Sequence, residues 1–161
     1  MNGCNTTVTV SQAVMGVDPG VRGGVSVLSR HGDPTFCEGL RPDMTESELV
    51  ALLKSAAKDL DLQGGDVCYF EKVGTMPHDG RMGAFTFGRI TGFLRGALTM
   101  AGVSIKSVAP GMWQSALGCL TGGNKNITKT KAQELFPSVK VTHATADSLL
   151  IAAYGQRKES L

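Results

Sequence analysis

Three acidic residues stand beside apolar segments, where a fold could bring their carboxylates together. Asp18 ends the apolar segment AVMGVD, Glu71 ends DVCYFE, and Asp147 lies within HATADSLLIAAYG. Because clustered carboxylates repel one another, they need cations, and hard oxygen ligands select Mg²⁺ or Mn²⁺. Two such ions about 4 Å apart can activate water and stabilise the leaving oxygen of a phosphodiester. The three acids are therefore candidates for metal-dependent phosphodiester hydrolysis.

Each of these residues also has a simpler interpretation. Asp18 begins a DPG sequence, which is typical of a turn. Asp147 is expected in the first turn of a helix, where an acid complements the helix dipole. Its neighbours are apolar, however, and a buried unpaired acid is costly. His143, four residues earlier, is a candidate fourth metal ligand or proton-transfer group, and equally a surface or capping histidine.

The apolar periodicity predicts the elements that would position these residues. Thr45 and Glu48 form a capping-box pattern that opens a helix, and Gly64-Gly65 ends it. The first three strands form an antiparallel meander, and later helices and strands alternate. This order predicts an α/β fold, a mixed five-stranded sheet flanked by helices. We expect strands at 13–18, 24–29, 35–40, 66–71 and 103–108, and further helices at 82–101, 110–118, 127–136 and 144–157.

If the first and fourth strands are parallel neighbours, Asp18 and Glu71 leave the same edge of the sheet side by side. The helix at 82–101 carries Gly88, Gly92 and Gly96 at a spacing of four residues, on one face. That face allows close approach of another helix, either inside the core or in a partner.

Charge is distributed unevenly along the chain. The net charge is +2, but residues 81–146 carry eight Lys or Arg and one acid, Glu134, whereas residues 1–80 carry six Lys or Arg and eleven Asp or Glu. A basic half of this kind suits a polyanion such as nucleic acid, or it is a solvated basic surface.

The length and composition favour one domain over residues 1–161, with 1–12 as a flexible N-terminal arm. No apolar run approaches the ~20 residues of a membrane span, and the start of the chain lacks the pattern of a secretory signal. The four cysteines are scattered without a C-x-x-C pair, which disfavours a zinc site. We expect an intracellular protein, in the cytoplasm of a bacterium or phage-infected host or in an organelle, with no membrane association.

An ordered set of motifs resembles the RuvC-type Holliday-junction resolvases of the RNase H-like superfamily, most of all phage-encoded and organellar members. The motifs run through most of the chain: GVDPG (16–20), YFEKV (69–73), the glycine-bearing helix (83–101), VAPGMWQSALG (108–118), TKTKAQELFP (128–137) and HATADSLLIAAYG (143–155).

The resemblance implies an RNase H-like fold and a magnesium-dependent endonuclease for four-way DNA junctions. Asp18, Glu71 and Asp147 match the metal-binding carboxylates, with Asp18 bridging two Mg²⁺ ions, for which Mn²⁺ can substitute. Many members carry a fourth acid where this chain has Ala144, and His143 is the candidate in its place.

The resemblance also implies DNA contacts and a homodimer. Lys129 matches a basic residue near the scissile phosphate, and Met76 occupies the loop where members often place an aromatic wedge. A dimer would form through the 83–101 helix and present two sites to the two strands of a junction. The further candidate phosphate contacts are Arg81, Arg89, Lys125 and Lys131.

Three other classes of protein share part of this pattern. A different RNase H-like nuclease, acting on RNA–DNA hybrids or on RNA, would share the carboxylates. A non-catalytic junction-binding module would keep the fold without the metals. A sugar-kinase or actin-type ATPase also opens with a strand-Asp-x-Gly turn, but it needs a second domain for which 161 residues leave no room.

Overall fold

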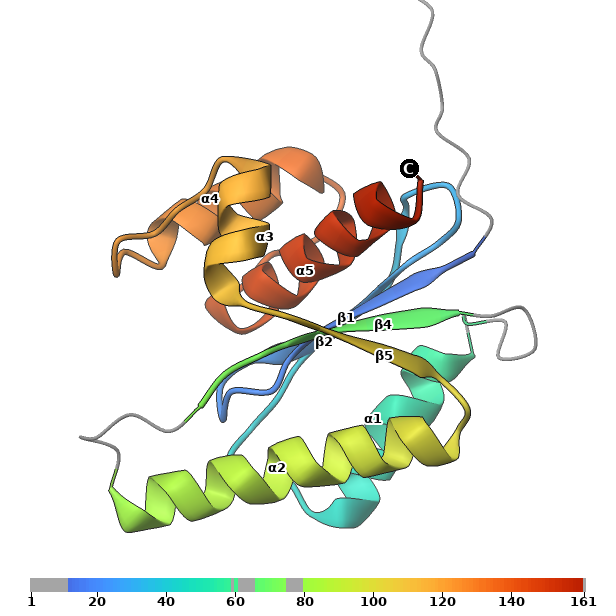
Figure 1. The fold of residues 1–161 in the computed structure, drawn as a ribbon, viewed down its shortest axis with the longest axis vertical. Coiled ribbons are helices and arrows are strands. Elements are labelled where there is room, and N and C mark those ends of the chain that lie inside the picture. Colours follow the sequence, from blue (N-terminus) through green and yellow to red (C-terminus); the bar gives the residue numbers. More distant parts are fainter. Residues whose placement is uncertain (1–11, 59, 61–65, 75–79, 161) are drawn as a thin grey trace, which may run out of the picture.

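A five-stranded mixed sheet forms the middle layer of the molecule (Figure 1). The computed structural model describes residues 12–58, 60, 66–74 and 80–160. The strand order is β3-β2-β1-β4-β5, with β2 antiparallel to both of its neighbours and β4 parallel to β1 and β5. The expected sheet and meander are confirmed. The strands are β1 (Val14–Asp18), β2 (Gly24–Leu28), β3 (Pro34–Gly39), β4 (Val67–Glu71) and β5 (Ser104–Val108).

Helices cover both faces of this sheet (Figure 1). One face is covered by α1 (Glu46–Ala57) and α2 (Arg81–Met100). The other face is covered by α3 (Pro110–Leu117), α4 (Asn126–Leu135) and α5 (His143–Glu159).

The start of α5 corrects one expectation. The helix begins at His143, with Thr142 as its N-cap, and no acid lies in its first turn. Asp147 therefore lies in the second turn, and the prediction of a first-turn acid that complements the dipole is wrong. The reason is local, because Thr142 and Thr145 form a reciprocal cap that starts the helix early.

Strand alternation decides the face on which the two strand acids lie. Successive side chains of a strand point to opposite faces of the sheet. Met15 and Val17 belong to the core beneath α1 and α2, as do Cys68 and Phe70 of β4. The strand ends Asp18 and Glu71, one residue further along each strand, thus face the layer of α3, α4 and α5.

Glycines let α5 lie directly on the sheet. A Cβ at Gly16 would collide with the backbone oxygen of Ser148 and come within 2.5 Å of the Ala152 nitrogen. A Cβ at Gly24 would lie 2.5 Å from the Ala144 carbonyl oxygen. Real Cβ contacts are longer than this, so these positions must be glycine for α5 to pack where it does. This docking places Asp147 over the ends of the central strands.

The far end of α5 is fixed by a polar cluster. Glu159 Oε1 accepts hydrogen bonds from the Tyr69 hydroxyl at 2.7 Å and from Lys106 Nζ at 2.6 Å. Gln12 Nε2 donates to Glu159 Oε2 at 3.2 Å. Residues 1–11 of the expected N-terminal arm lie outside the described residues.

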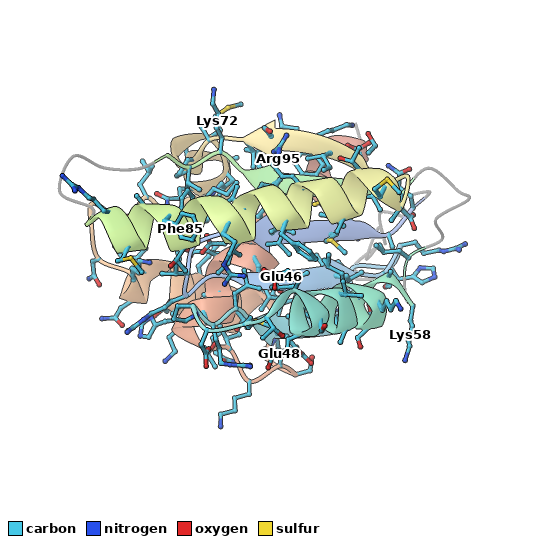
Figure 2. The ribbon with its side chains drawn as sticks, turned by 90° about the horizontal axis from the view of Figure 1, so that it is seen from below. Glu46, Glu48, Lys58, Lys72, Phe85 and Arg95 are labelled. Carbon is cyan, nitrogen blue, oxygen red and sulfur yellow. The ribbon has the colours of Figure 1, made fainter. Side chains whose placement is uncertain are left out.

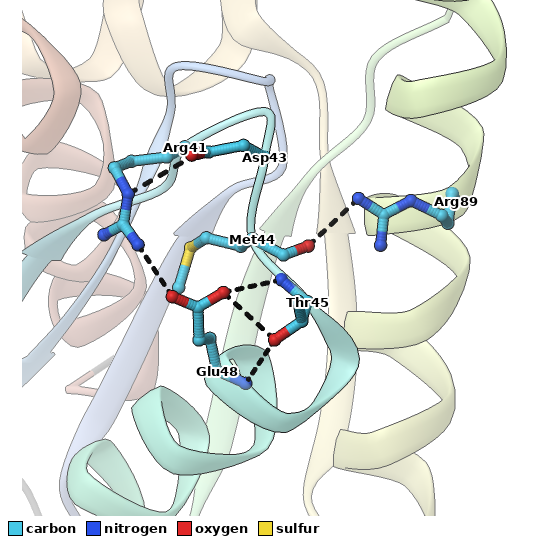
Figure 3. Close-up of polar contacts among 6 residues, drawn as sticks. All are labelled: Arg41, Asp43, Met44, Thr45, Glu48 and Arg89. Atoms are coloured by element: carbon cyan, nitrogen blue, oxygen red, sulfur yellow. Dashed lines mark hydrogen bonds and ion pairs between the residues drawn. The ribbon is translucent and has the colours of Figure 1, made fainter.

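The predicted capping box of α1 is confirmed (Figure 3). Glu48 Oε2 accepts from the Thr45 backbone at 2.8 Å, and the Thr45 hydroxyl accepts from Glu48 N at 3.3 Å. Arg89 reaches across from α2 and donates to the Met44 carbonyl at 3.0 Å, and it also pairs with Glu46 at 2.9 Å. Arg89 therefore joins α2 to the start of α1.

Helix α2 buries one face and leaves the opposite one open. Ile90, Leu94 and Leu98 pack in the core. Apart from its chain neighbours and the backbone of its own helix, nothing described lies within 4 Å of a Cβ added at Gly88, Gly92 or Gly96. Figure 2 looks onto this side of the molecule, with Phe85 near one end of α2 and Arg95 farther along it. The large apolar side chains exposed on α2 are Met82, Phe85 and Met100.

Within the described part of the chain, no helix is long and apolar enough to cross a membrane. The three cysteines in that part, Cys37, Cys68 and Cys119, are free thiols.

Candidate active site

The three predicted acids line one pocket of about 470 Å³ at the carboxyl ends of β1 and β4. Asp18 ends β1, Glu71 ends the parallel neighbour β4, and Asp147 reaches the pocket from α5. The register pairs Val17 with Phe70, so the two strand acids follow directly side by side. The remaining lining residues are Gly20, Val21, Arg22, Gly23, Val73, Phe87, Pro110, Gln114 and Lys125.

Asp18 is buried, and the turn that follows wraps around its carboxylate. The Gly20 backbone donates to Asp18 Oδ1 at 3.0 Å. A Cβ at Gly23 would lie 2.6 Å from Asp18 Cγ, so the carboxylate occupies the space that a side chain there would need. Burial raises the pKa of Asp18, and the Asp147 charge adds to this, whereas the Gly20 hydrogen bond and the Lys125 charge oppose it.

Glu71 is buried and receives a hydrogen bond from an indole. Trp113 Nε1 donates to Glu71 Oε1 at 2.8 Å. Burial, followed by the negative charge of Asp18, raises the pKa of Glu71 to about 7. The Asp147 charge acts in the same direction, and Trp113 and Lys125 oppose it. Glu71 is thus held in a site whose negative charge is only partly compensated.

Asp147 contributes the least satisfied oxygen of the site. Its Oδ1 atom is buried and has no hydrogen-bond partner among the described residues. A buried carboxylate oxygen without a partner is costly, and a bound cation would remove that cost.

The residues of this pocket can be compared with the ligands that a divalent cation requires. As the side chains stand, no three His, Cys, Asp or Glu residues within the described ranges form a closed cluster that could hold a metal ion. The chemistry of the donors nevertheless fits, because three carboxylates supply hard oxygen ligands, one oxygen lacks a partner, and the Asp147 charge raises the pKa of both Asp18 and Glu71. A magnesium site stays a prediction that these observations support.

His143 and Ala144 lie just before Asp147 on α5. His143 is exposed and does not line the pocket, although it lies one helical turn from Asp147. The Ala144 Cβ lies 3.0 Å from the position of a Cβ built at Gly39, so this side chain faces the sheet. The role of His143 stays a prediction.

The predicted basic residues lie in different surroundings. Lys125, the N-cap of α4, lines the pocket, and Lys129 follows one turn later. Lys131 lines a separate pocket of about 440 Å³ between α3 and α4. Arg81 is the exposed first residue of α2. Arg89 is held by α1, as described above, which leaves it little freedom for a phosphate, and Met76 lies outside the described residues.

Sequence reasoning missed two features of the site. It did not identify Trp113 as a hydrogen-bond donor to Glu71. It also missed Gln114, which lines the pocket beside Pro110. The segment PGMWQ begins two residues after β5, and Val108 at the end of β5 pairs with Glu71. That pairing joins segments far apart in the sequence, so the sequence alone did not reveal it.

No family model matches the chain. Among curated proteins, the chain is similar to the chloroplastic Holliday junction resolvase MOC1 of Chlamydomonas reinhardtii, at 34% identity over 92 residues. That match covers 53% of this chain and 10% of MOC1, so the chain spans about a tenth of the length of that relative.

Solved structures share the fold. RuvC of Thermus thermophilus, free and in complex with a Holliday junction substrate, matches with a TM-score of 0.65 at 19% identity, over 91% of this chain and 96% of RuvC. The yeast mitochondrial Holliday junction resolvase Ydc2 matches with a TM-score of 0.54 at 12% identity, over 96% of this chain and 83% of Ydc2. The fold is therefore RNase H-like, as the sequence predicts, and the chain resembles RuvC-type resolvases, organellar ones among them.

Proposed function

We propose that this chain, which has the fold of RuvC, is a Mg²⁺-dependent endodeoxyribonuclease that resolves four-way DNA junctions by paired symmetric nicks. The convergence of Asp18, Glu71 and Asp147 on one pocket, together with Lys125, is the observation that carries the proposal. The printed names of the similar proteins, MOC1 and RuvC, support junction DNA as the substrate.

In this proposal Asp18, Glu71 and Asp147 would hold two Mg²⁺ ions, for which Mn²⁺ can substitute. When bound, the ions supply a nucleophilic water at neutral pH and neutralise charge at the scissile phosphate. Gly20 holds Asp18 in place through its backbone N–H, and Lys125 adds a positive charge at the rim of the pocket. The products carry a 5′-phosphate and a 3′-hydroxyl.

DNA contacts are assigned to the side of the molecule that carries the pocket. Lys125 and Lys129 lie one turn apart at the start of α4, and Lys131 and Arg81 add exposed or half-buried positive charge. Contacts of this kind position a phosphate backbone and carry no sequence information. Met76 stays the candidate wedge, and His143 the candidate fourth ligand or proton-transfer group.

The active form is proposed to be a homodimer of single-domain chains. A junction has two strands to cut symmetrically, and a two-fold dimer presents two equivalent sites. The open glycine face of α2 (Gly88, Gly92 and Gly96) would form the interface, since nothing described covers it.

Asp18→Asn tests the proposal on a panel of four-way junction, linear duplex and RNA–DNA hybrid with Mg²⁺. The wild-type protein is expected to nick only the junction, and Asp18→Asn to bind the junction without cutting, since ligation is lost while the basic surface stays. Asp33→Asn, an exposed acid in the β2–β3 turn, is the matched control and should cut normally.

Near-normal cutting by Asp18→Asn would contradict the assignment of the site. Preferential cutting of the hybrid would favour a different RNase H-like nuclease, and binding without cutting by the wild-type protein would favour a junction-binding module.

A further inference from the structure

A buried hydrogen bond connects helix α3 to the candidate site. The Trp113 indole donates to Glu71 Oε1 at 2.8 Å, and the indole is fully buried. It packs in the core with Leu117, Val108 and Phe136. Because protein cores are close-packed, this indole is held in one orientation.

The backbone places the two partners at the same edge of the sheet. Val108, the last residue of β5, pairs with Glu71 in parallel register, and Lys72 N donates to the Val108 carbonyl at 2.7 Å. Helix α3 begins two residues later, at Pro110, so Trp113 lies in its first turn directly beside Glu71. The pairing of β4 with β5 therefore holds the Trp113 donor and the Glu71 acceptor next to each other.

An indole N–H can only donate. It therefore favours the charged, accepting form of the Glu71 carboxylate, and it fixes the position of one carboxylate oxygen. Among hydrophobic neighbours a Phe or Leu would fill the same space without this effect.

From this geometry we propose that Trp113 is a positioning residue that orients the Glu71 carboxylate for a divalent cation in the pocket. The proposal rests on the cation site of the proposed function and adds a residue outside the three acids. Partners that orient metal ligands by hydrogen bonding commonly contribute 10- to 100-fold to metal affinity.

Because Trp113 is the only tryptophan in the sequence, it can be replaced without touching any other side chain. In a tryptophan auxotroph, β-(3-benzothienyl)alanine keeps the bicyclic shape and replaces the N–H with sulfur. Trp113→Phe provides an encoded variant that also lacks the donor. Binding of Mn²⁺ to the DNA-free protein is measured from the loss of the free-Mn²⁺ EPR signal.

We expect both replacements to weaken Mn²⁺ binding by about 10- to 100-fold. Leu117→Ala, in the same helix and the same core, is the control for packing. It should lower the melting temperature while it leaves Mn²⁺ affinity within about twofold. Wild-type affinity in the benzothienyl protein, an equal loss in Leu117→Ala, or no Mn²⁺ binding by the wild-type protein would overturn the proposal.

Trp113 also supplies a spectroscopic signature. Its fluorescence should change saturably as Mg²⁺ is added to the wild-type protein, and Asp18→Asn should shift that titration to higher concentration. Emission that is insensitive to Mg²⁺ at concentrations that fill the site would count against the proposal.

Failure of this proposal can be distinguished from failure of the proposed function. If the wild-type protein cuts junctions and the indole replacement leaves Mn²⁺ affinity unchanged, the function stands and the role of Trp113 does not. If affinity depends on the indole but no junction is cut, the role of Trp113 stands and the proposed activity does not.

Discussion

Asp18 closes the turn after β1 through one carboxylate oxygen, which accepts from Gly20 N, and it also lines the pocket with Glu71 and Asp147. The DPG sequence alone therefore does not show whether Asp18 forms a turn or belongs to the site, because the same carboxylate does both. The turn holds the carboxylate, and Gly23 leaves room for it.

The raised pKa of Glu71 predicts how stability depends on pH without a cation. Its ordinary value is 4.5, and in the folded protein it is about 7. Between these values the folded state binds more protons than the unfolded state, so the free energy of unfolding falls as pH rises through this window. The fall is at most about 3 kcal/mol.

Glu71→Gln is expected to remove most of this pH dependence and to be more stable than the wild-type protein above about pH 7 in a chelator. Urea unfolding in EDTA, below pH 4.5 and above about pH 7, measures the pH dependence of the free energy of unfolding. Glu134→Gln, an exposed acid on α4, should keep the wild-type dependence. Identical pH dependence in wild-type and Glu71→Gln protein would show that Glu71 titrates normally.

Among the elements, α5 is essential for the site, because it brings Asp147 close to Asp18 at the end of β1 and Glu71 at the end of β4. Its contact with β1 depends on Gly16, where a Cβ would meet the backbone of Ser148 and Ala152. Overpacking commonly costs about 1–3 kcal/mol, and here a rigid backbone stands in the way.

Gly16→Ala is therefore expected to lower the free energy of unfolding by about 3 kcal/mol or more and to weaken cation binding, because Asp147 moves away from Asp18. Thermal unfolding and Mn²⁺ binding measure the two effects. Gly111→Ala on α3, where an added Cβ meets nothing described within 4 Å, should be neutral or slightly stabilising. A fully stable Gly16→Ala protein with wild-type Mn²⁺ affinity would contradict this account of how α5 is placed.

Most elements could be predicted because their signals are local. The capping box at Thr45 and Glu48 and the short apolar strand before Asp18 need only neighbouring residues. The glycine contacts of α5 and the bond from Trp113 to Glu71 join residues far apart in the sequence, so no local pattern predicts them. Arg89 shows the same limit, since its partners Met44 and Glu46 lie far away in the sequence, just before and at the start of α1.

At the scale of the whole molecule, several positive charges of the basic half (residues 81–146) have partners within the chain. Arg89 pairs with Glu46, and Lys106 pairs with Glu159. Arg95 lies over the Phe70 ring at 5.1 Å. Within this half, Lys125 at the pocket, with Lys129 one turn away, is the positive charge best placed for a phosphate near the acids, and Arg22 also lines the pocket.

We expect two chains to associate through the exposed glycine face of α2 (Gly88, Gly92 and Gly96). Gly92→Glu places a charge on that face, where an added Cβ meets nothing described within 4 Å apart from its chain neighbours and the backbone of its own helix. In light scattering the wild-type protein should have the mass of two chains, and Gly92→Glu the mass of one. Ser138→Glu, exposed after α4, should remain dimeric. A Gly92→Glu protein that stays dimeric would place the interface elsewhere.

The most direct test of the account is the addition of Mg²⁺ to a protein–junction complex assembled in a chelator, with each DNA strand labelled in turn. Wild-type protein is then expected to nick two opposing strands at symmetric positions, and Asp147→Asn protein is expected to hold the junction uncut. A junction that stays intact with wild-type protein, or one that Asp147→Asn cuts at the wild-type rate, would contradict the claim that these three carboxylates form a cation-dependent nuclease site.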